Sequence, residues 1–270
     1  MTAELGLSPP MSATEHLEME IRRLVAGIPI GVDPGLDDYR QNLGDTSYST
    51  GINRHIRAFL LYRNYAESGS KFLDWGCRHA WDSCLVRMVN KNAEIEGCDI
   101  TDDIAANTKA FAGMKYTRLE HSWKLPYADN AFDRVIGSGV LEHVPLMSAS
   151  LDELYRIIEP GGFLMITFLP NSYSYSEFIA RNVFRNFCHR RLYTKACLRR
   201  LLLEHGFEPV KMGHHQVMPS LTSGHRHLPW QWMRRTFQAL FKLDPFLEHI
   251  WPLKILSANL YAVARKREYI

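Results

Sequence analysis

The chain has 270 residues, of which 46% are hydrophobic and 23% are charged, and its net charge is +3. This is an ordinary globular composition, and it excludes a disordered, collagen-like or disulfide-scaffold chain. The five cysteines form no CxxC pair, and the start "MTAELGLSPPMSATEHLEME" has neither the basic end nor the apolar core of a signal peptide. We therefore expect a cytoplasmic protein in a reducing compartment.

The charges divide unevenly along the chain. Residues 1–170 carry 16 basic and 23 acidic groups, a net charge of −7, whereas residues 171–270 carry 16 basic and 6 acidic groups, a net charge of +10. A cationic ligand would suit the first part and an anionic partner the second. The alternative interpretation is that these charges are solvated side chains spread over the surface.

The first 70 residues predict an N-terminal helical cap. Residues 12–28 begin with a Ser/Thr cap signal and place Leu17, Ile21 and Leu24 at helical spacing. The next stretch, residues 28–51, is rich in Gly, Pro, Asp and Asn and predicts a loop. A second helix is expected over residues 52–68, ending at Gly69.

From Lys71 onward, short apolar strands alternate with helices. Such alternation predicts βαβ units with right-handed crossovers and a mostly parallel sheet. The expected strands are residues 71–77, 93–100, 131–140, 163–170, one within 193–212, and 256–266. The expected helices are residues 80–92, residues 101–114, a helix that begins at residue 146 and is stopped by Pro160, Gly161 and Gly162, and a helix that begins at residue 193 and precedes the strand within 193–212. We interpret residues 171–193 and 214–253 as insertions that cover one edge of the site.

Two strands end in an acid. The first ends in Asp74-Trp75-Gly76-Cys77, and the second ends at Asp99, 25 residues after Asp74. In open α/β sheets, ligands bind at the carboxyl ends of the strands, where an acid after the second strand can accept hydrogen bonds from both ribose hydroxyls of a nucleoside. The segment "GCRHAW" after the first strand contains one glycine, so the G-x-G-x-x-G pattern of dinucleotide-binding proteins is absent.

Five segments occur in order over residues 70–213: "FLDWGCRHA", "IEGCDI", "LPYADNAFDRVIGSGVLEHVP", "LYRIIEPGGFLMITFLP" and "LRRLLLEHGFEPV". Together they resemble the class I S-adenosylmethionine-dependent methyltransferases, in the small-molecule branch with LDxGCGxG, LPFxDxxFD, VLEHV and LKPGG motifs. The resemblance implies a Rossmann-like α/β fold with a seven-stranded sheet of order 3-2-1-4-5-7-6, the last strand antiparallel. The methyltransferase domain would span residues 71–270, with S-adenosylmethionine as cofactor and S-adenosylhomocysteine as product.

The same resemblance implies the site residues. Asp74 would lie near the amino group of the cofactor, Asp99 would bind the ribose, and residues 121–123 would flank the adenine. The full cofactor-binding set is Asp74, Trp75, Gly76, Cys77, Arg78, Asp99, Ile100, Ser122, Trp123 and Ser138. His143, after the fourth strand, is the candidate general base, because an imidazole can accept a proton at neutral pH. The alternative is that His143 only braces the turn.

The chain departs from the family pattern at three places. Arg78 and Ala80 replace loop glycines, and His121 replaces an expected acid. An arginine forced into a left-handed backbone costs about 1–2 kcal/mol. Some hydroxyl methyltransferases of this branch bind a divalent ion through E-x-x-E-H, but here Gly139 stands at the first carboxylate position. Two remaining ligands rarely hold Mg²⁺, so the sequence predicts no metal.

The insertions supply the expected acceptor residues and partners. Aromatic and basic side chains in the first insertion are candidates for substrate binding, although a helix packed on the sheet would explain them equally: Tyr173, Tyr175, Arg181 and Tyr193. Residues 228–253 mix Trp, Phe and Leu with Arg and Lys, which favours a membrane surface, a lipid-linked substrate, a lid or a dimer contact.

The prediction is therefore O-methylation of a hydroxyl on a small molecule: a secondary metabolite, a sugar or a lipid-linked glycan. No nucleic-acid partner is expected, because no Asn-Pro-Pro-Tyr-type segment follows the fourth strand. The alternative function is a catalytically degenerate methyltransferase fold that serves as a binding or scaffold protein. The sequence makes no prediction about oligomeric state.

Overall fold

A seven-stranded sheet forms the centre of the molecule in the computed structural model, which describes residues 12–26, 50–101, 106–184, 189–217 and 243–268. Its strand order is β3-β2-β1-β4-β5-β7-β6. All neighbouring pairs are parallel except those of β7, which runs antiparallel to β5 and β6. The predicted order and the antiparallel last strand are thus confirmed. The strands are β1 (Lys71–Trp75), β2 (Glu94–Asp99), β3 (Lys115–Arg118), β4 (Phe132–Ser138), β5 (Ile158–Pro170), β6 (Phe207–His215) and β7 (Asn259–Lys266).

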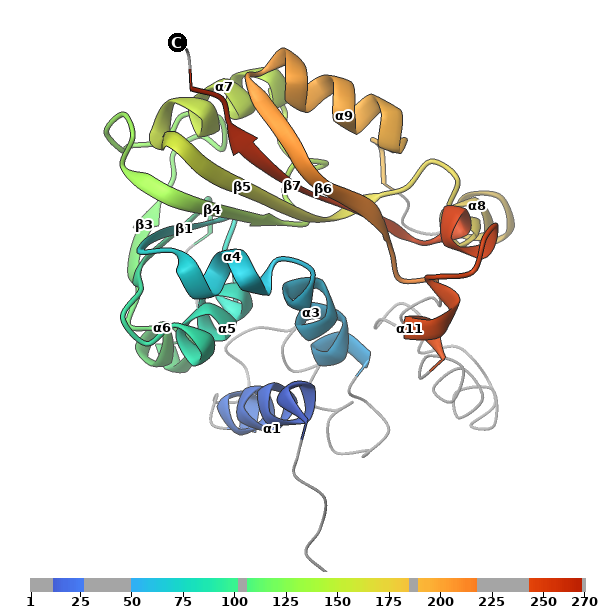
Figure 1. The fold of residues 1–270 in the computed structure, drawn as a ribbon, viewed down its shortest axis with the longest axis horizontal. Helices are drawn as coiled ribbons and strands as arrows, with labels where there is room; N and C mark the ends of the chain where they lie inside the picture. Colours follow the sequence, from blue (N-terminus) through green and yellow to red (C-terminus); the bar gives the residue numbers. More distant parts are fainter. Residues whose placement is uncertain (1–11, 27–49, 102–105, 185–188, 218–242, 269–270) are drawn as a thin grey trace, which may run out of the picture.

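Helices cover both faces of this sheet (Figure 1). One face carries α1 (Ala13–Ala26), α3 (Thr50–Leu60), α4 (Arg63–Ser68), α5 (Trp81–Val89) and α6 (Ala106–Ala112); the other carries α7 (Met147–Ile157) and α9 (Lys195–Glu204). A hydrophobic core lies between the sheet and the helices on each face, and successive residues of a strand point alternately into one core and the other. Phe72 and Ile136 join the core beneath α3 and α5, whereas Leu73 and Val135 join the core that contains Leu154 of α7.

Short elements gather at one end of the sheet, beyond the ends of β5 and β6 (Figure 1). They are α8 (Tyr175–Ile179), a π-helical turn (Ala180–Phe184), α11 (Asp244–Leu247) and a 3₁₀ turn (Leu253–Leu256). The predicted insertion 171–193 falls partly on α8 and the π-helical turn. Most of the predicted insertion 214–253 lies outside the described residues, and its first two residues belong to β6.

The sequence-based boundaries were wrong at two points. The helix expected over residues 52–68 is two helices, because the chain turns at Leu61 and Tyr62, and the fully buried Tyr62 donates a hydrogen bond to Asp82. The strand expected to begin at Phe163, β5, begins at Ile158, directly after α7 ends at Ile157. Ile158 pairs with Phe132 across a register irregularity, with the Pro-Gly-Gly segment accommodated inside the strand.

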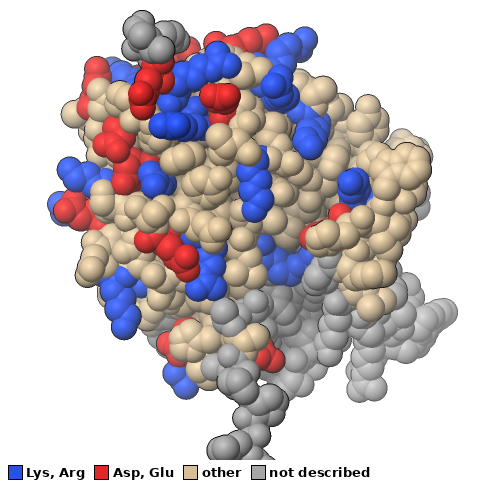
Figure 2. Space-filling model, viewed as in Figure 1, with Lys and Arg blue, Asp and Glu red and all other residues tan. Residues whose placement is uncertain are grey.

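The helices before β1 share a core with the sheet. Buried Ile56 and Phe59 of α3 belong to the same hydrophobic cluster as Phe72 of β1 and Leu85 of α5. The boundary at residue 70 between a helical cap and a methyltransferase domain stays a prediction, and this shared core shows that α3 packs directly on the fold. Across the described part of the chain, no helix is long and apolar enough to cross a membrane. On the face shown in Figure 2, acidic and basic side chains are interspersed over the upper part of the molecule.

Candidate functional site

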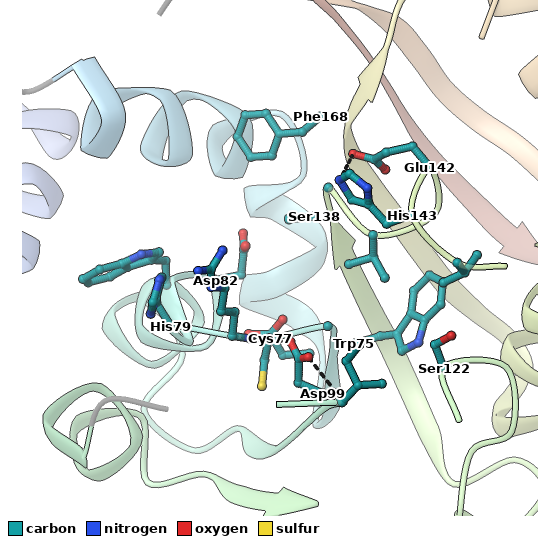
Figure 3. A pocket seen from close by; sticks show the side chains of 18 of the residues that line it. Trp75, Cys77, His79, Asp82, Asp99, Ser122, Ser138, Glu142, His143 and Phe168 are labelled. Atoms are coloured by element: carbon teal, nitrogen blue, oxygen red, sulfur yellow. Dashed lines mark hydrogen bonds and ion pairs between the residues drawn. The ribbon is translucent and has the colours of Figure 1, made fainter. Parts of the chain in front are cut away.

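A pocket of about 640 Å³ opens at the carboxyl ends of β1, β2 and β4. This volume is typical of small-molecule sites. Its walls come from the β1–α5 loop, the end of β2, the turn after β4, and α3 (Figure 3). Among the sequence-predicted residues, the structure brings together here Asp74, Trp75, Gly76, Cys77, Arg78, Asp99, Ile100, Ser122, Ser138 and His143.

The β1–α5 loop is fixed to the neighbouring strand end. The amides of Gly76 and Cys77 both donate to the carbonyl of Cys98, at 2.8 and 3.1 Å. Gly76, Arg78 and Ala80 all have positive φ, at 69°, 34° and 56°. The loop thus keeps left-handed backbone at the two positions where the resembled family carries glycine. Each non-glycine residue in this region costs about 1–2 kcal/mol, so the altered loop holds its conformation against local strain.

Asp99 is held at the end of β2 by backbone amides. One carboxylate oxygen, Oδ2, accepts from the amide of Arg78 at 3.0 Å, and Oδ1 accepts from those of Ile100 and Thr101 at 2.7 and 3.3 Å. Each carboxylate oxygen has two acceptor sites. The contacts therefore fix the side chain and leave it capacity for further donors.

A second acidic wall is formed by Asp74 and Asp82. Oδ2 of the buried Asp74 accepts from the amide and hydroxyl of Ser83 at 3.2 and 2.6 Å, which ties β1 to the first turn of α5. Burial, reinforced by the neighbouring Asp82 carboxylate, raises the pKa of Asp74 to about 7. Burial also raises the pKa of Asp82. Both carboxylates line the pocket, where a bound cation would stabilise their ionised forms.

The opposite end of the pocket carries Glu142 and His143 (Figure 3). Oε1 of Glu142 lies 3.7 Å from Nε2 of His143, and Oε2 of Glu142 is buried without a hydrogen-bond partner. Burial raises the pKa of Glu142 to about 7, and burial together with the nearby His189 lowers the pKa of His143. His189 also lines this end, with its Nδ1 2.5 Å from Oε1 of Glu177.

Several residues that line this side were not predicted from the sequence, among them His189 and three residues that meet around one aromatic ring. Arg54 and His55 come from α3, and Phe168 comes from β5. The Arg54 guanidinium lies 4.7 Å from the centre of the Phe168 ring, and the His55 ring meets that ring edge-on at 5.0 Å. Burial lowers the pKa of His55 to about 3, so its ring is neutral. Nothing in the sequence marks these residues, because α3 has the pattern of an ordinary amphipathic helix and Phe168 lies within an apolar strand.

Phe168 has an unusual backbone for a strand residue. Its φ is 59°, and the pairing of β5 with β7 shifts register between Ile166 and Leu169. A positive φ is a rare outlier for a bulky residue. The bulge at Phe168 sets its ring against Arg54 and His55 at the wall of the pocket.

The other predicted residues lie away from the pocket lining. Trp123 stacks on His121, with ring centres 4.8 Å apart and planes 13° apart. Tyr173 is exposed, and Tyr175 is half-buried, which raises its pKa to about 12. Tyr193 is buried behind the β4 turn.

Two of these residues support the lining instead. The hydroxyl of Tyr193 donates to the carbonyl of Leu141 at 3.4 Å, directly before Glu142. Arg181 donates through Nη2 to the carbonyl of His189 at 2.9 Å. In this structure the first insertion therefore contributes His189 to the pocket and uses Arg181 and Tyr193 as its braces.

The sheet order, the antiparallel β7 and the acidic ends of β1 and β2 define the class I S-adenosylmethionine-dependent methyltransferases. A sequence profile described as "Methyltransferase domain" matches residues 48–212. The chain belongs to this family. The matched range begins before α3, so it includes the helix that supplies Arg54 and His55 to the pocket.

Individual relatives are more distant. A demethylmenaquinone methyltransferase from Staphylococcus saprophyticus is 36% identical over 104 residues, which cover 37% of this chain and 44% of that protein. The chain thus matches less than half the length of this relative. A chain of the Haloferax volcanii complex between the Trm112 methyltransferase activator and a methyltransferase is 13% identical with a TM-score of 0.56, covering 86% of this chain and 98% of that one. The [4+2]-cyclase SpnF is 20% identical with a TM-score of 0.55, covering 97% and 99%.

Proposed function

We propose that this protein transfers a methyl group from S-adenosylmethionine to a hydroxyl on a small molecule. The observation that carries the proposal is one continuous pocket. It joins the acidic strand ends, Asp74 and Asp99, to a polar end built from Glu142, His143 and His189. Methyl transfer needs a cofactor and an acceptor held in line within such a pocket.

The residues at the strand ends fit the cofactor. Asp74, Asp82 and Asp99 are acceptor-only carboxylates when ionised, as suits a ligand with an ammonium group, a sulfonium group and two ribose hydroxyls. A side chain at Gly76 would meet Cγ2 of Val140 at 2.4 Å, so the backbone here lies close to the β4 turn. S-adenosylmethionine would supply a methyl group on a positively charged sulfur; the protein binds and orients it.

The acceptor would enter at the polar end of the pocket. Phe168 and the neutral His55 would give the wall beside it two uncharged rings, next to the Arg54 guanidinium. His143, predicted as the catalytic residue, lies here with its side chain 56% exposed, so an acceptor can reach it. Replacing His143 with alanine is expected to lower turnover at least tenfold and leave cofactor binding unchanged.

The acceptor class is the finer part of the proposal. The polar groups Glu142, His143 and His189 favour a hydroxyl, since they can accept its proton or its hydrogen bond. The relatives named as demethylmenaquinone methyltransferases make a quinone-type aromatic a second class to assay. Exposed Phe246 and Trp251 support the expectation of a lipid-linked acceptor or a membrane surface. Sedimentation with lipid vesicles at low salt would test that expectation.

The test is methyl transfer from S-adenosylmethionine carrying a labelled methyl group. Purified protein is incubated with hydroxylated aromatics, sugars and quinols, and product structure separates O-methylation from C-methylation. Asp99→Asn serves as the cofactor-site variant. We expect labelled product with wild type and less than a tenth of it with the variant.

The alternative function, a degenerate scaffold, rests on the strained loop at Arg78 and Ala80. A scaffold would give no labelled product with any acceptor and no binding of the cofactor. Cofactor binding without product would leave the pocket assignment intact and reject only the acceptors tested.

A further inference from the structure

Three potential metal ligands meet at the acceptor end of the pocket. Glu142, His143 and His189 each offer one ligand atom, and these atoms all lie within 4.8 Å of one another. Glu142 and His143 are adjacent in the turn after β4, and His189 arrives from the insertion after β5, 46 residues later in the chain. A divalent ion with tetrahedral bonds of about 2.0–2.2 Å to nitrogen and oxygen would hold its ligand atoms about 3.3–3.6 Å apart, so binding requires these three side chains to move slightly closer together.

Among these three side chains, the buried carboxylate of Glu142 is the one that a bound cation would stabilise most. The residue is 7% exposed, and its Oε2 has no hydrogen-bond partner. A buried carboxylate without a partner is unfavourable, and buried charges are ordinarily paired or coordinate a metal. The ion-pair contact of Glu142 with His143, at 3.7 Å, is beyond hydrogen-bond distance, and the charges of His189 and Arg54 also act on this carboxylate.

A second carboxylate supports His189 from behind. Oε1 of Glu177 lies 2.5 Å from Nδ1 of His189, and Oε2 of Glu177 accepts from the His189 amide at 3.3 Å. Metal-binding histidines are typically oriented in this way by an outer carboxylate. Because Nδ1 of His189 is held by Glu177, a metal would be bound through Nε2.

We propose that Glu142, His143 and His189 bind one divalent transition-metal ion, with an open coordination position that faces the pocket. Two imidazoles and one carboxylate favour Zn²⁺ or a similar ion over Mg²⁺, which prefers oxygen ligands. This proposal revises the sequence-based expectation of no metal. That expectation considered only the segment Gly139 to His143, and His189 supplies the third ligand from elsewhere in the chain.

The binding itself does not depend on the proposed methyl transfer, although its use does. An ion in this position would lower the pKa of a bound oxygen ligand, which a hydroxyl acceptor needs. His143 would then act as a ligand, so the metal and the general base are alternative uses of the same imidazole. A metal titration without cofactor or acceptor decides between them.

The experiment is calorimetric titration of Zn²⁺ into untagged, chelator-treated protein. The chain has 12 histidines, so weak background binding is expected and the comparison of variants is decisive. Wild type should bind one tight equivalent, and Glu142→Gln, His143→Ala and His189→Ala should each weaken it at least tenfold. Glu177→Gln should weaken it by about tenfold, as loss of an outer carboxylate does.

The matched control is His16→Ala, which removes one exposed imidazole from α1 and should leave the tight equivalent unchanged. Urea midpoints confirm that each variant is folded, and Glu142→Gln keeps the volume of the buried side chain. Binding by Glu142→Gln and His189→Ala equal to that of wild type would overturn the proposal, as would the absence of a tight equivalent in wild type.

Discussion

Substituting alanine for Gly76 tests whether the close packing of the β1 and β4 ends maintains the pocket. The φ of Gly76 is +69°, which costs an L-residue about 1–2 kcal/mol. The new Cβ would also lie 2.4 Å from Cγ2 and 3.0 Å from Cγ1 of Val140. Overpacking of this kind costs about 1–3 kcal/mol. We therefore expect Gly76→Ala to lower the free energy of unfolding by about 2–5 kcal/mol.

Gly113 provides a matched control. Its φ is +59°, but a Cβ there would meet only Nη2 of Arg87, at 3.7 Å. Gly113→Ala should therefore cost only the backbone part, about 1–2 kcal/mol. Adding Val140→Ala to Gly76→Ala removes the two methyl groups that clash, so the double variant should recover most of the overpacking cost.

The assay is urea unfolding followed by circular dichroism, with wild type, the three single variants and the double variant in one series. The coupling between positions 76 and 140 is obtained as a double-mutant cycle. Equal losses for Gly76→Ala and Gly113→Ala, or no coupling with Val140, would refute the reasoning that the β4 turn and the β1–α5 loop are in tight contact.

Three further predictions concern charge. The raised pKa of Asp74, about 7, comes from burial and the Asp82 carboxylate. A cationic cofactor favours the ionised carboxylate, so the affinity of the protein for the cofactor should rise between pH 6 and 8, by at most tenfold per pH unit. The rise should be weaker for Asp74→Asn, and equal pH profiles for wild type and this variant would contradict the prediction. Arg57→Ala should destabilise the protein by about 3–5 kcal/mol, since it removes the guanidinium that lies 2.5 Å from the fully buried Asp244 and 2.7 Å from Glu248. A loss no larger than that of the surface-pair control Arg63→Ala, about 0.5 kcal/mol, would show that these ion pairs contribute little. Asp99→Asn should weaken cofactor binding at least tenfold in calorimetry, because the carboxylate is proposed to accept from the ribose. The new amide group also takes the place of an oxygen that accepts a backbone N–H, so the urea midpoint is measured to confirm that the variant is folded at the assay temperature. Unchanged affinity would remove Asp99 from that role.

Much of the fold could be predicted because its elements have local signatures. The strands that carry Asp74 and Asp99 are short apolar runs followed by turn residues, and α7 has helical periodicity. β3 lacks such a signature. Its four residues have no apolar run, and it is a strand because Gly97 and Cys98 of β2 pair with Tyr116 and Thr117. Only the family resemblance implied this seventh strand.

The site was predictable to a different extent at its two ends. The residues at the cofactor end lie where strands end, and the sequence pattern predicts those positions. The acceptor end depends on contacts between distant segments. His189 meets Glu142 because the insertion folds back through Arg181 and Glu177, and Arg54 enters because α3 packs over the sheet. The spacing of residues along the chain does not predict these contacts between distant segments. The left-handed backbone of Phe168 depends on a β-bulge, and an uninterrupted apolar run in the sequence does not indicate one.

The central claim is that the pocket between Asp74, Asp99 and the β4 turn binds S-adenosylmethionine. Isothermal titration of the cofactor into the purified 270-residue chain tests it most directly. We expect saturable binding of one equivalent near micromolar affinity, with S-adenosylhomocysteine competing for the same site. A flat titration at millimolar cofactor would contradict the account.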